Sequence, residues 1–237
     1  MRIRLQKDID KLKKRAISLG ALVEERFRMA LKAIECRDAD LAGKVVDGDM
    51  EIDELEVDIE EDCLKILALH QPVADQLRFI ITILKMNNDL ERIGDLAVNI
   101  AQRGQSIARR SQKANPFDYS TMGRKTEEML EKSLDSLVNW DLSLAYEVLS
   151  RDDEVDLMKN TVQEQFAREL SKAQDNAESM IDFFLVSRHL ERIADHATNI
   201  AEDVIYMITG EIHRHKEIVV IRGSDAWFEA PRRVEQD

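Results

Sequence analysis

Apolar residues recur every three or four positions along most of the chain, which is the pattern of amphipathic α-helices. The first such stretch runs from Leu5 to Ile34 and predicts one long helix. A polar turn follows at residues 37–40, where Asp38 is placed to cap a second helix because its side chain accepts a bond from a free N–H of the first turn. The chain therefore opens on two helices joined by a short turn.

The second predicted helix continues without interruption through Ile66, and Pro72 ends it. Proline is tolerated in a first helical turn, so a third helix is expected to begin at Pro72 and to stop near Ser111. Residues 113–118 are polar and break the periodicity. We interpret them as the connection between two halves of the chain.

The second half repeats the first. Residues 190–201 match residues 90–101 at an offset of 100, and nine of the twelve pairs are identical. A second match has an offset of 103 and pairs apolar residues throughout, with Ile52, Leu55, Ile59 and Cys63 on Val155, Met158, Val162 and Phe166. The change of offset predicts a shorter connection in the second copy, around residues 172–176.

The repeat places three further helices near residues 118–139, 141–172 and 176–213. We therefore predict an all-α fold with two pseudo-symmetric three-helix bundles, at residues 1–113 and 118–213, built from six long helices. Few residues oppose this, since the chain has three prolines, eight glycines and 5% aromatic residues. The tail, residues 216–237, breaks the pattern, and we expect it to be weakly ordered or docked on the surface.

The formal net charge of −13 argues against nonspecific binding of nucleic acid, which needs a basic surface. It is compatible with cation binding. Because no signal peptide or long apolar run is visible, we expect a cytoplasmic protein. Cys36 and Cys63 lack a metal-type spacing and are predicted to be reduced core thiols.

Pairs of acidic residues spaced by four recur in both copies. Glu91 and Asp95 share one helix face, Asn99 extends it by a turn, and Asp49 and Asp53 form the same pair on the preceding helix. If these helices pack side by side, four carboxylates converge and favour a hard cation such as Mg, Ca, Mn or Fe. The second copy offers Asp152, Asp156, Glu191, Asp195 and Asn199.

Acids spaced by four also occur on ordinary solvated helix faces, so the pattern alone does not identify a metal site. Neighbouring positions have diverged between the copies, with Asn88 against Arg188 and Asp89 against His189. The acids persist amid that divergence, which favours the metal-ligand interpretation. Arg92 and Arg192 are interpreted as ion-pairing residues.

His189 and His196 flank the second acidic motif. A histidine beside carboxylates can ligate a transition metal, although such a residue is more often an ordinary surface histidine. No phosphate-binding glycine loop, G-x-S-x-G elbow or paired-cysteine motif occurs, and no Glu-x-x-His motif of di-iron bundle enzymes is present. We therefore expect a protein that is not an enzyme.

The residues at 90–95, 190–195, Gly48-Asp49 and Gln71-Pro72 resemble the PhoU family of phosphate-transport regulators, in order and spacing over residues 1–215. The resemblance implies two three-helix bundles, a homodimer, and metal clusters, with multinuclear iron or zinc suggested by the family. It also implies a cytoplasmic repressor of the phosphate-starvation response. The implied partners are the ATPase subunit of the phosphate ABC transporter and a sensor histidine kinase, with only peripheral association with the membrane complex.

The resemblance assigns the metal ligands to all eight acids of the doubled motif, namely Asp49, Asp53, Glu91, Asp95, Asp152, Asp156, Glu191 and Asp195. Gly48 precedes the first motif where Arg151 precedes the second, a difference that predicts two unequal sites. The alternative function is that of a metal-storage or metal-buffering protein, in which the clusters themselves are the function.

Overall fold

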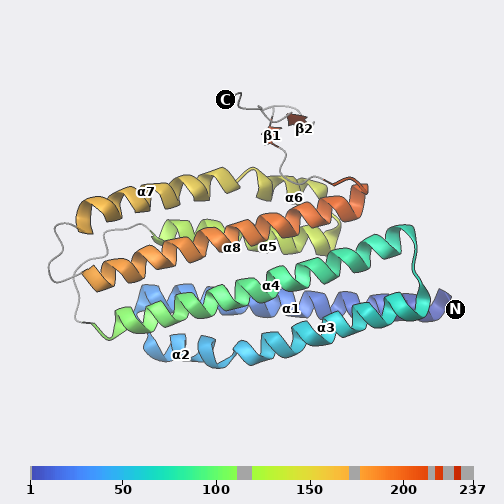
Figure 1. Ribbon diagram of the computed structural model, residues 1–237, viewed down its shortest axis with the longest axis horizontal. Helices are drawn as coiled ribbons and strands as arrows, with labels where there is room; N and C mark the ends of the chain where they lie inside the picture. Colours follow the sequence, from blue (N-terminus) through green and yellow to red (C-terminus); the bar gives the residue numbers. More distant parts are fainter. Residues whose placement is uncertain (1, 111–118, 171–176, 213–216, 221–226, 231–237) are drawn as a thin grey trace.

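Eight α-helices and two short β-strands form the part of the chain that the computed structural model describes, residues 2–110, 119–170, 177–212, 217–220 and 227–230 (Figure 1). The helices are α1 (Arg2–Cys36), α2 (Ala39–Asp47), α3 (Asp49–His70), α4 (Ala74–Ala108), α5 (Tyr119–Asn139), α6 (Leu142–Leu149), α7 (Asp152–Leu170) and α8 (Ala177–Thr209). The strands are β1 (Glu217–Val220) and β2 (Trp227–Ala230).

The predicted all-α architecture is confirmed. In the first half α1, α4 and the pair α2 and α3 pack together, and in the second half α5, α8 and the pair α6 and α7 do the same (Figure 1). In each half, the second predicted helix is therefore one rod broken into two helices. The first half lies along the second through α4 and α8.

The break in the first rod occurs at Gly48, where a continuous helix was predicted. The Gly48 N–H bonds to the carbonyls of Lys44 at 3.2 Å and Val45 at 3.3 Å, which tightens the last turn of α2. A Cβ at this position would lie 2.7 Å from Cζ of Arg26, so the glycine leaves room for that guanidinium. The second rod breaks at Ser150 and Arg151. Glycine disfavours helix, but serine and arginine gave no such signal.

The predicted helix starts and stops are largely confirmed. Asp38 caps α2, accepting a bond from the Leu41 N–H at 2.9 Å. Gln71, with φ of 46°, ends α3 in the left-handed region. The helix α4 begins at Ala74, two residues later than predicted, because the chain remains extended at Val73. The connections predicted at 113–118 and 172–176 lie outside the described residues.

A single hydrophobic core runs through both halves. At its centre α4 and α8 pack antiparallel, a contact that we call the central seam. The two repeats therefore share one core through the seam.

Polar contacts along the central seam follow the pseudo-symmetry of the repeat. Arg103 pairs with buried Asp182 at 3.3 Å, and the Thr82 hydroxyl donates to the carbonyl of Asp203 at 3.2 Å. At an offset of 100, Thr82 corresponds to Asp182 and Arg103 to Asp203, so these two contacts are equivalent. Lys85 adds an ion pair to the Asp203 carboxylate.

The tail contains the antiparallel pair β1 and β2, with Glu217 opposite Ala230 and Val220 opposite Trp227. Regular strands were not predicted there, although the β-branched run at residues 218–221 favours them.

No described helix is long and apolar enough to cross a membrane. Cys63 is buried as predicted, whereas the prediction for Cys36 was wrong, because it ends α1 with its side chain exposed.

In each copy an outer helix (α3 or α7) packs on a seam helix (α4 or α8), and the residue sizes at this contact differ in a complementary way between the copies. Gly94 faces Ile52, whose Cδ1 would lie 3.0 Å from an added Cβ. The equivalent pair is Ala194 and Val155, both 1% exposed. A larger residue thus accompanies the glycine and a smaller one accompanies the alanine.

This compensation predicts energetic coupling between Gly94 and Ile52. Gly94→Ala crowds Ile52, and Ile52→Val removes the crowded Cδ1. The double variant should therefore be more stable than the sum of the two single changes in unfolding free energy predicts, by about 0.5–2 kcal/mol. Urea unfolding of the four proteins in the cycle measures this coupling. Combining Gly94→Ala with Ile59→Val, two turns further along α3, should be additive, and equal coupling in both cycles would contradict the packing argument.

Candidate metal centres

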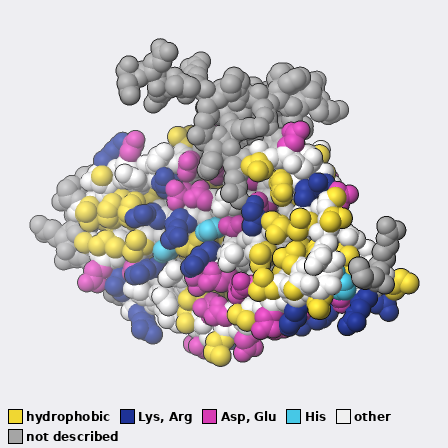
Figure 2. All heavy atoms as spheres, turned by 45° about the vertical axis from the view of Figure 1, so that its right-hand side comes forward, with side chains coloured by type: hydrophobic (Ala, Val, Ile, Leu, Met, Phe, Trp, Pro, Cys, Tyr) yellow, Lys and Arg dark blue, Asp and Glu magenta, His cyan; other side chains and the backbone are white. Residues whose placement is uncertain are grey.

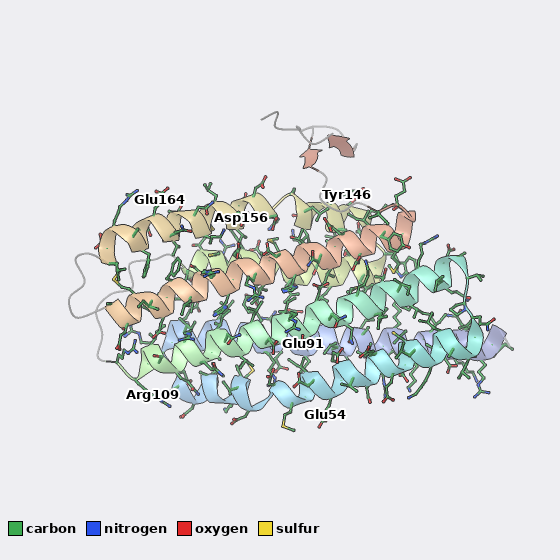
Figure 3. The ribbon with its side chains drawn as sticks, in the orientation of Figure 1. Glu54, Glu91, Arg109, Tyr146, Asp156 and Glu164 are labelled. Carbon is green, nitrogen blue, oxygen red and sulfur yellow. The ribbon has the colours of Figure 1, made fainter. Side chains whose placement is uncertain are left out.

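The first set of predicted acids lies where α3 packs on α4. Asp49 is the first residue of α3, in the turn where the helix dipole favours a carboxylate, and Asp53 follows one turn later. Glu91 and Asp95 project from the middle of α4, and Glu91 is visible between the two helices (Figure 3). The break at Gly48 therefore places Asp49 at a helix start, which sequence reasoning missed.

Electrostatic coupling shows that these acids converge. Burial raises the pKa of Asp49, and the charges of Asp53 and Asp95 raise it further. Burial and the charge of Asp95 also raise the pKa of Glu91, with Asp53 and Glu56 adding to the shift against the opposing effect of Arg92. We call Asp49, Asp53, Glu56, Glu91 and Asp95 cluster 1. Carboxylates from two helices share one patch, as predicted.

Sequence reasoning did not include Glu56 in the site. It lies seven residues after Asp49, and this spacing puts the two on one face of α3. The periodicity could therefore have identified it. Burial raises the pKa of Glu56, and the charges of Glu60 and Asp53 raise it further.

Arg92 supplies positive charge at the edge of cluster 1. Its guanidinium pairs with Glu91 and with Asp95, each at 3.3 Å, as the ion-pairing interpretation predicted. Both partners belong to its own helix. The Arg92 side chain is 59% exposed, so solvent weakens these pairs.

The second set lies where α7 packs on α8, and we call Asp152, Asp156, Glu191 and Asp195 cluster 2. Partial burial raises the pKa of Asp195 to about 6, and the charges of Glu191, Asp152 and Asp156 add to the shift. The pKa of Asp152 is also raised, chiefly by burial, although the Thr198 hydroxyl donates to it at 3.2 Å. Asp156, labelled on α7 in Figure 3, is exposed to solvent.

The second-tier residues and the histidines have separate places. Asn99 is partly buried on α4, whereas Asn199 donates to Asp89 across the central seam at 3.2 Å. His196 pairs with the same carboxylate at 2.7 Å. His189 is partly buried, and burial together with nearby arginines lowers its pKa to about 4. The interpretation of His189 and His196 as ordinary surface histidines predicted exposed side chains, but both are partly buried.

Both clusters offer oxygen donors, which suit hard cations, and both concentrate negative charge that a cation would relieve. Within the described residues, however, no three carboxylate, imidazole or thiol groups already form a metal-ligand set. The chemistry of the donors fits a metal ion. Closing a ligand shell would require the acidic side chains to rotate toward a common point.

Comparison with known proteins identifies the fold and the repeat together. The PhoU domain model matches residues 16–104 and again residues 119–204, which covers both three-helix units. The chain belongs to the PhoU family.

PhoU relatives span nearly the whole chain. The phosphate-specific transport system accessory protein PhoU homolog of Aquifex aeolicus is 37% identical, over 91% of this chain and 98% of the relative. PhoU homolog 1 of Thermotoga maritima is 34% identical, over 88% and 90%. These relatives are named accessory proteins, which agrees with the expectation that the chain is not an enzyme.

Solved PhoU structures share the architecture. The crystal structure of PhoU from Pseudomonas aeruginosa superposes with a TM-score of 0.84 at 32% identity, over 87% of this chain and 99% of that one. The phosphate transport system regulatory protein PhoU from Streptococcus pneumoniae gives a TM-score of 0.81 at 29% identity, over 88% and 98%.

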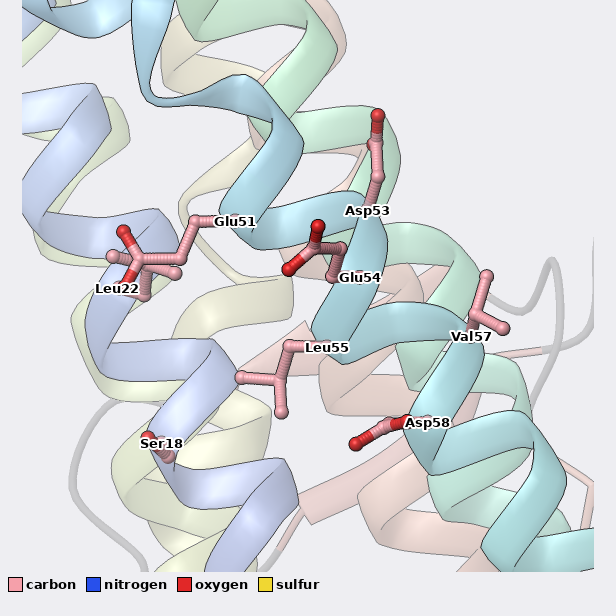
Figure 4. Close-up of a pocket in the computed structure, with 8 residues that line it drawn as sticks. All are labelled: Ser18, Leu22, Glu51, Asp53, Glu54, Leu55, Val57 and Asp58. Carbon is pink, nitrogen blue, oxygen red and sulfur yellow. The ribbon is translucent and has the colours of Figure 1, made fainter.

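A pocket of this PhoU-family chain lies beside cluster 1, between α1 and α3 (Figure 4). Ser18 and Leu22 line it from α1, and six residues line it from α3, namely Glu51, Asp53, Glu54, Leu55, Val57 and Asp58. Only Asp53 belongs to cluster 1. On the face of the molecule drawn in Figure 2, acidic side chains gather in patches with basic residues between them.

The raised pKa of Asp195 gives a testable pH dependence for the metal-free PhoU-family chain. An aspartate normally titrates near about 4, so the folded state binds this proton more tightly than the unfolded state does. The resulting contribution to stability is present at low pH and is lost as pH rises from about 4 to about 6. Asp195→Asn should therefore raise the melting temperature at pH 7 more than at pH 4.5.

Thermal unfolding in the presence of a chelator measures this difference. Asp135→Asn, at an exposed position of α5 outside both clusters, is the matched control and should show no such pH-dependent gain. A gain for Asp195→Asn that is equal at both pH values would refute the proposed repulsion within cluster 2.

Proposed function

We propose that this protein is a metal-binding regulator of phosphate uptake that acts in the cytoplasm and represses phosphate-starvation signalling. The observation that carries the proposal is the PhoU-domain match over both three-helix units. Relatives at 30–37% identity over most of the chain, including the one from Escherichia coli K12, are named accessory proteins of the phosphate-specific transport system. Participation in phosphate transport is the part best supported.

The proposed partners are the ATPase subunit of the phosphate ABC transporter and a sensor histidine kinase, and the protein acts as a homodimer. Two features support peripheral docking on such a membrane complex. No described helix is suited to cross a membrane, and the net charge of −13 disfavours direct binding to anionic lipid headgroups. Contact with the membrane system therefore runs through protein partners.

The metal part of the proposal rests on the two acidic clusters. Cluster 1 would hold an ion with Asp49, Asp53, Glu91 and Asp95, and cluster 2 with the equivalent acids of α7 and α8. A bound cation supplies a positive charge that relieves carboxylate repulsion and holds the outer helix to the seam helix. Metal binding would thus make helix docking dependent on ion supply.

Loss of the protein should switch on phosphate-starvation genes even in abundant phosphate. A deletion strain carrying a phosphate-regulated reporter tests this, with restoration by the wild-type gene as the control. The tagged protein should also retain the transporter ATPase subunit or the sensor kinase on purification. Normal reporter regulation in the deletion strain, together with failure to retain either partner, would overturn the proposal.

Removing one acid from each cluster should separate metal binding from regulation. The double variant Asp95→Asn and Asp195→Asn should lose at least tenfold in metal affinity, because the pooled charge in each cluster falls. Elemental analysis after purification without added metal measures the loss, with Asp135→Asn as the control. Metal in the wild type without any effect on regulation would instead favour metal storage, and no metal in any preparation would refute the metal part.

A further inference from the structure

The outer helices beside the two acidic clusters carry charges of opposite sign at one pair of equivalent positions. At the offset of 103, Glu56 of α3 corresponds to Lys159 of α7. The alignment is firm there, because Ile52 and Val155 one turn earlier are equivalent and both 1% exposed. The exchange of an acid for a base changes the formal charge beside the cluster by two units.

In cluster 2, Lys159 occupies the space between the acids of two helices. Its ammonium lies 3.1 Å from Glu191 of α8 and 3.9 Å from Asp156 of α7. The Asp195 carboxylate also interacts with it electrostatically. The lysine side chain is only 24% exposed, so these contacts are partly shielded from water. The cluster therefore contains a cation that is part of the chain.

In cluster 1, the equivalent position adds a carboxylate. Glu56 is held by Asn87 of α4, whose amide nitrogen donates to its Oε1 at 2.8 Å and to its backbone carbonyl at 2.9 Å. The nearby cation, Arg92, pairs with the acids of α4 from the exposed side. The carboxylates of α3 thus depend on solvent or a bound ion for compensation.

A second difference lies on the seam helices. Asn87 is 2% exposed, and its Oδ1 has no hydrogen-bond partner among the described residues. A buried, unpartnered oxygen is costly unless something binds it. At the offset of 100 its equivalent is Ser187, whose hydroxyl is satisfied by the Phe184 carbonyl at 2.7 Å. Only the first copy therefore combines a surplus carboxylate with a free oxygen acceptor.

We propose that the clusters are unequal cation sites: cluster 1, with Glu56, is the tight site for a divalent metal ion, whereas in cluster 2 the Lys159 ammonium is a built-in counter-ion that a metal must displace. The inference rests on the metal binding proposed above. It makes Lys159 a residue that sets affinity without being a ligand. One repeat then responds to metal at a lower concentration than the other.

Calorimetric titration of the metal-free full chain with Mn²⁺ tests the proposal. The wild type should show one tight and one weak class of site, with Asp95→Asn removing the tight class and Asp195→Asn the weak one. Lys159→Gln should tighten the weak class by about tenfold or more and leave the tight class unchanged. Glu56→Gln should weaken the tight class alone.

Two further variants control for charge and for general damage. Lys159→Arg keeps the positive charge and should leave the weak class weak. Lys125→Gln removes a lysine of similar exposure, which pairs with Glu154 at 2.6 Å outside the cluster, and should alter neither class. Without metal, Lys159→Gln should lower the melting temperature at pH 7 more than Lys125→Gln, because it leaves cluster 2 uncompensated.

The outcomes separate the two proposals. Mn²⁺ binding in two classes of equal affinity, or a weak class that Lys159→Gln leaves unchanged, would overturn the inequality and leave metal binding standing. An equal fall in melting temperature for Lys159→Gln and Lys125→Gln would refute the counter-ion role. No Mn²⁺ binding by any variant would overturn the metal part of the proposed function together with this inference.

Discussion

The packing of α4 against α8 is the contact on which the rest of the structure depends. Pairs such as Lys85 with Asp203 and Arg103 with Asp182 join the two helices, and the outer helices then cover the faces that remain. Successive residues turn by about 100° around a helix. Glu91 and Asp95 therefore lie on a different side of α4 from the residues that contact α8. The seam therefore fixes which side of α4 turns toward α3. The same geometry in α8 fixes the position of Glu191 and Asp195 against α7. Each acidic patch is a consequence of how the centre of the molecule packs.

Gathering carboxylates in this way opposes folding, because each charge raises the cost of ionising its neighbours. The two copies meet that cost differently. In cluster 2 a lysine from α7 reaches the acids of both helices, so the compensation belongs to the chain. In cluster 1 the arginine remains on its own helix and an additional carboxylate stands where the lysine would be. The two equivalent sites thus differ in whether the outer helix supplies a cation to the acids of the neighbouring helix.

Much of this molecule is readable from the sequence, and the exceptions have physical causes. Apolar periodicity predicted the long helices. The two offsets predicted that the eight motif acids occupy equivalent positions in the two copies, because a duplicated fold keeps equivalent residues in equivalent places. The breaks between α2 and α3 and between α6 and α7 were missed, since hydrophobic spacing continues through Gly48 and Ser150. The pairing of His196 with Asp89 depends on the register of two helices distant in sequence, which no local pattern encodes. The role of Lys159 depends on a long side chain reaching a neighbouring helix, and spacing along one helix does not reveal it.

The unlike charges along the central seam have a consequence for how the halves recognise each other. Lys85 and Arg103 both belong to α4, and Asp182 and Asp203 both belong to α8. Two copies of the first repeat joined through α4 in the same antiparallel register would set Lys85 against Arg103, and two copies of the second would set Asp182 against Asp203. Like charges would then meet in a largely buried interface. The central seam thus favours the pairing of unlike halves. Each half carries charges opposite to those of the other half, and a second copy of the same half would meet it with like charges.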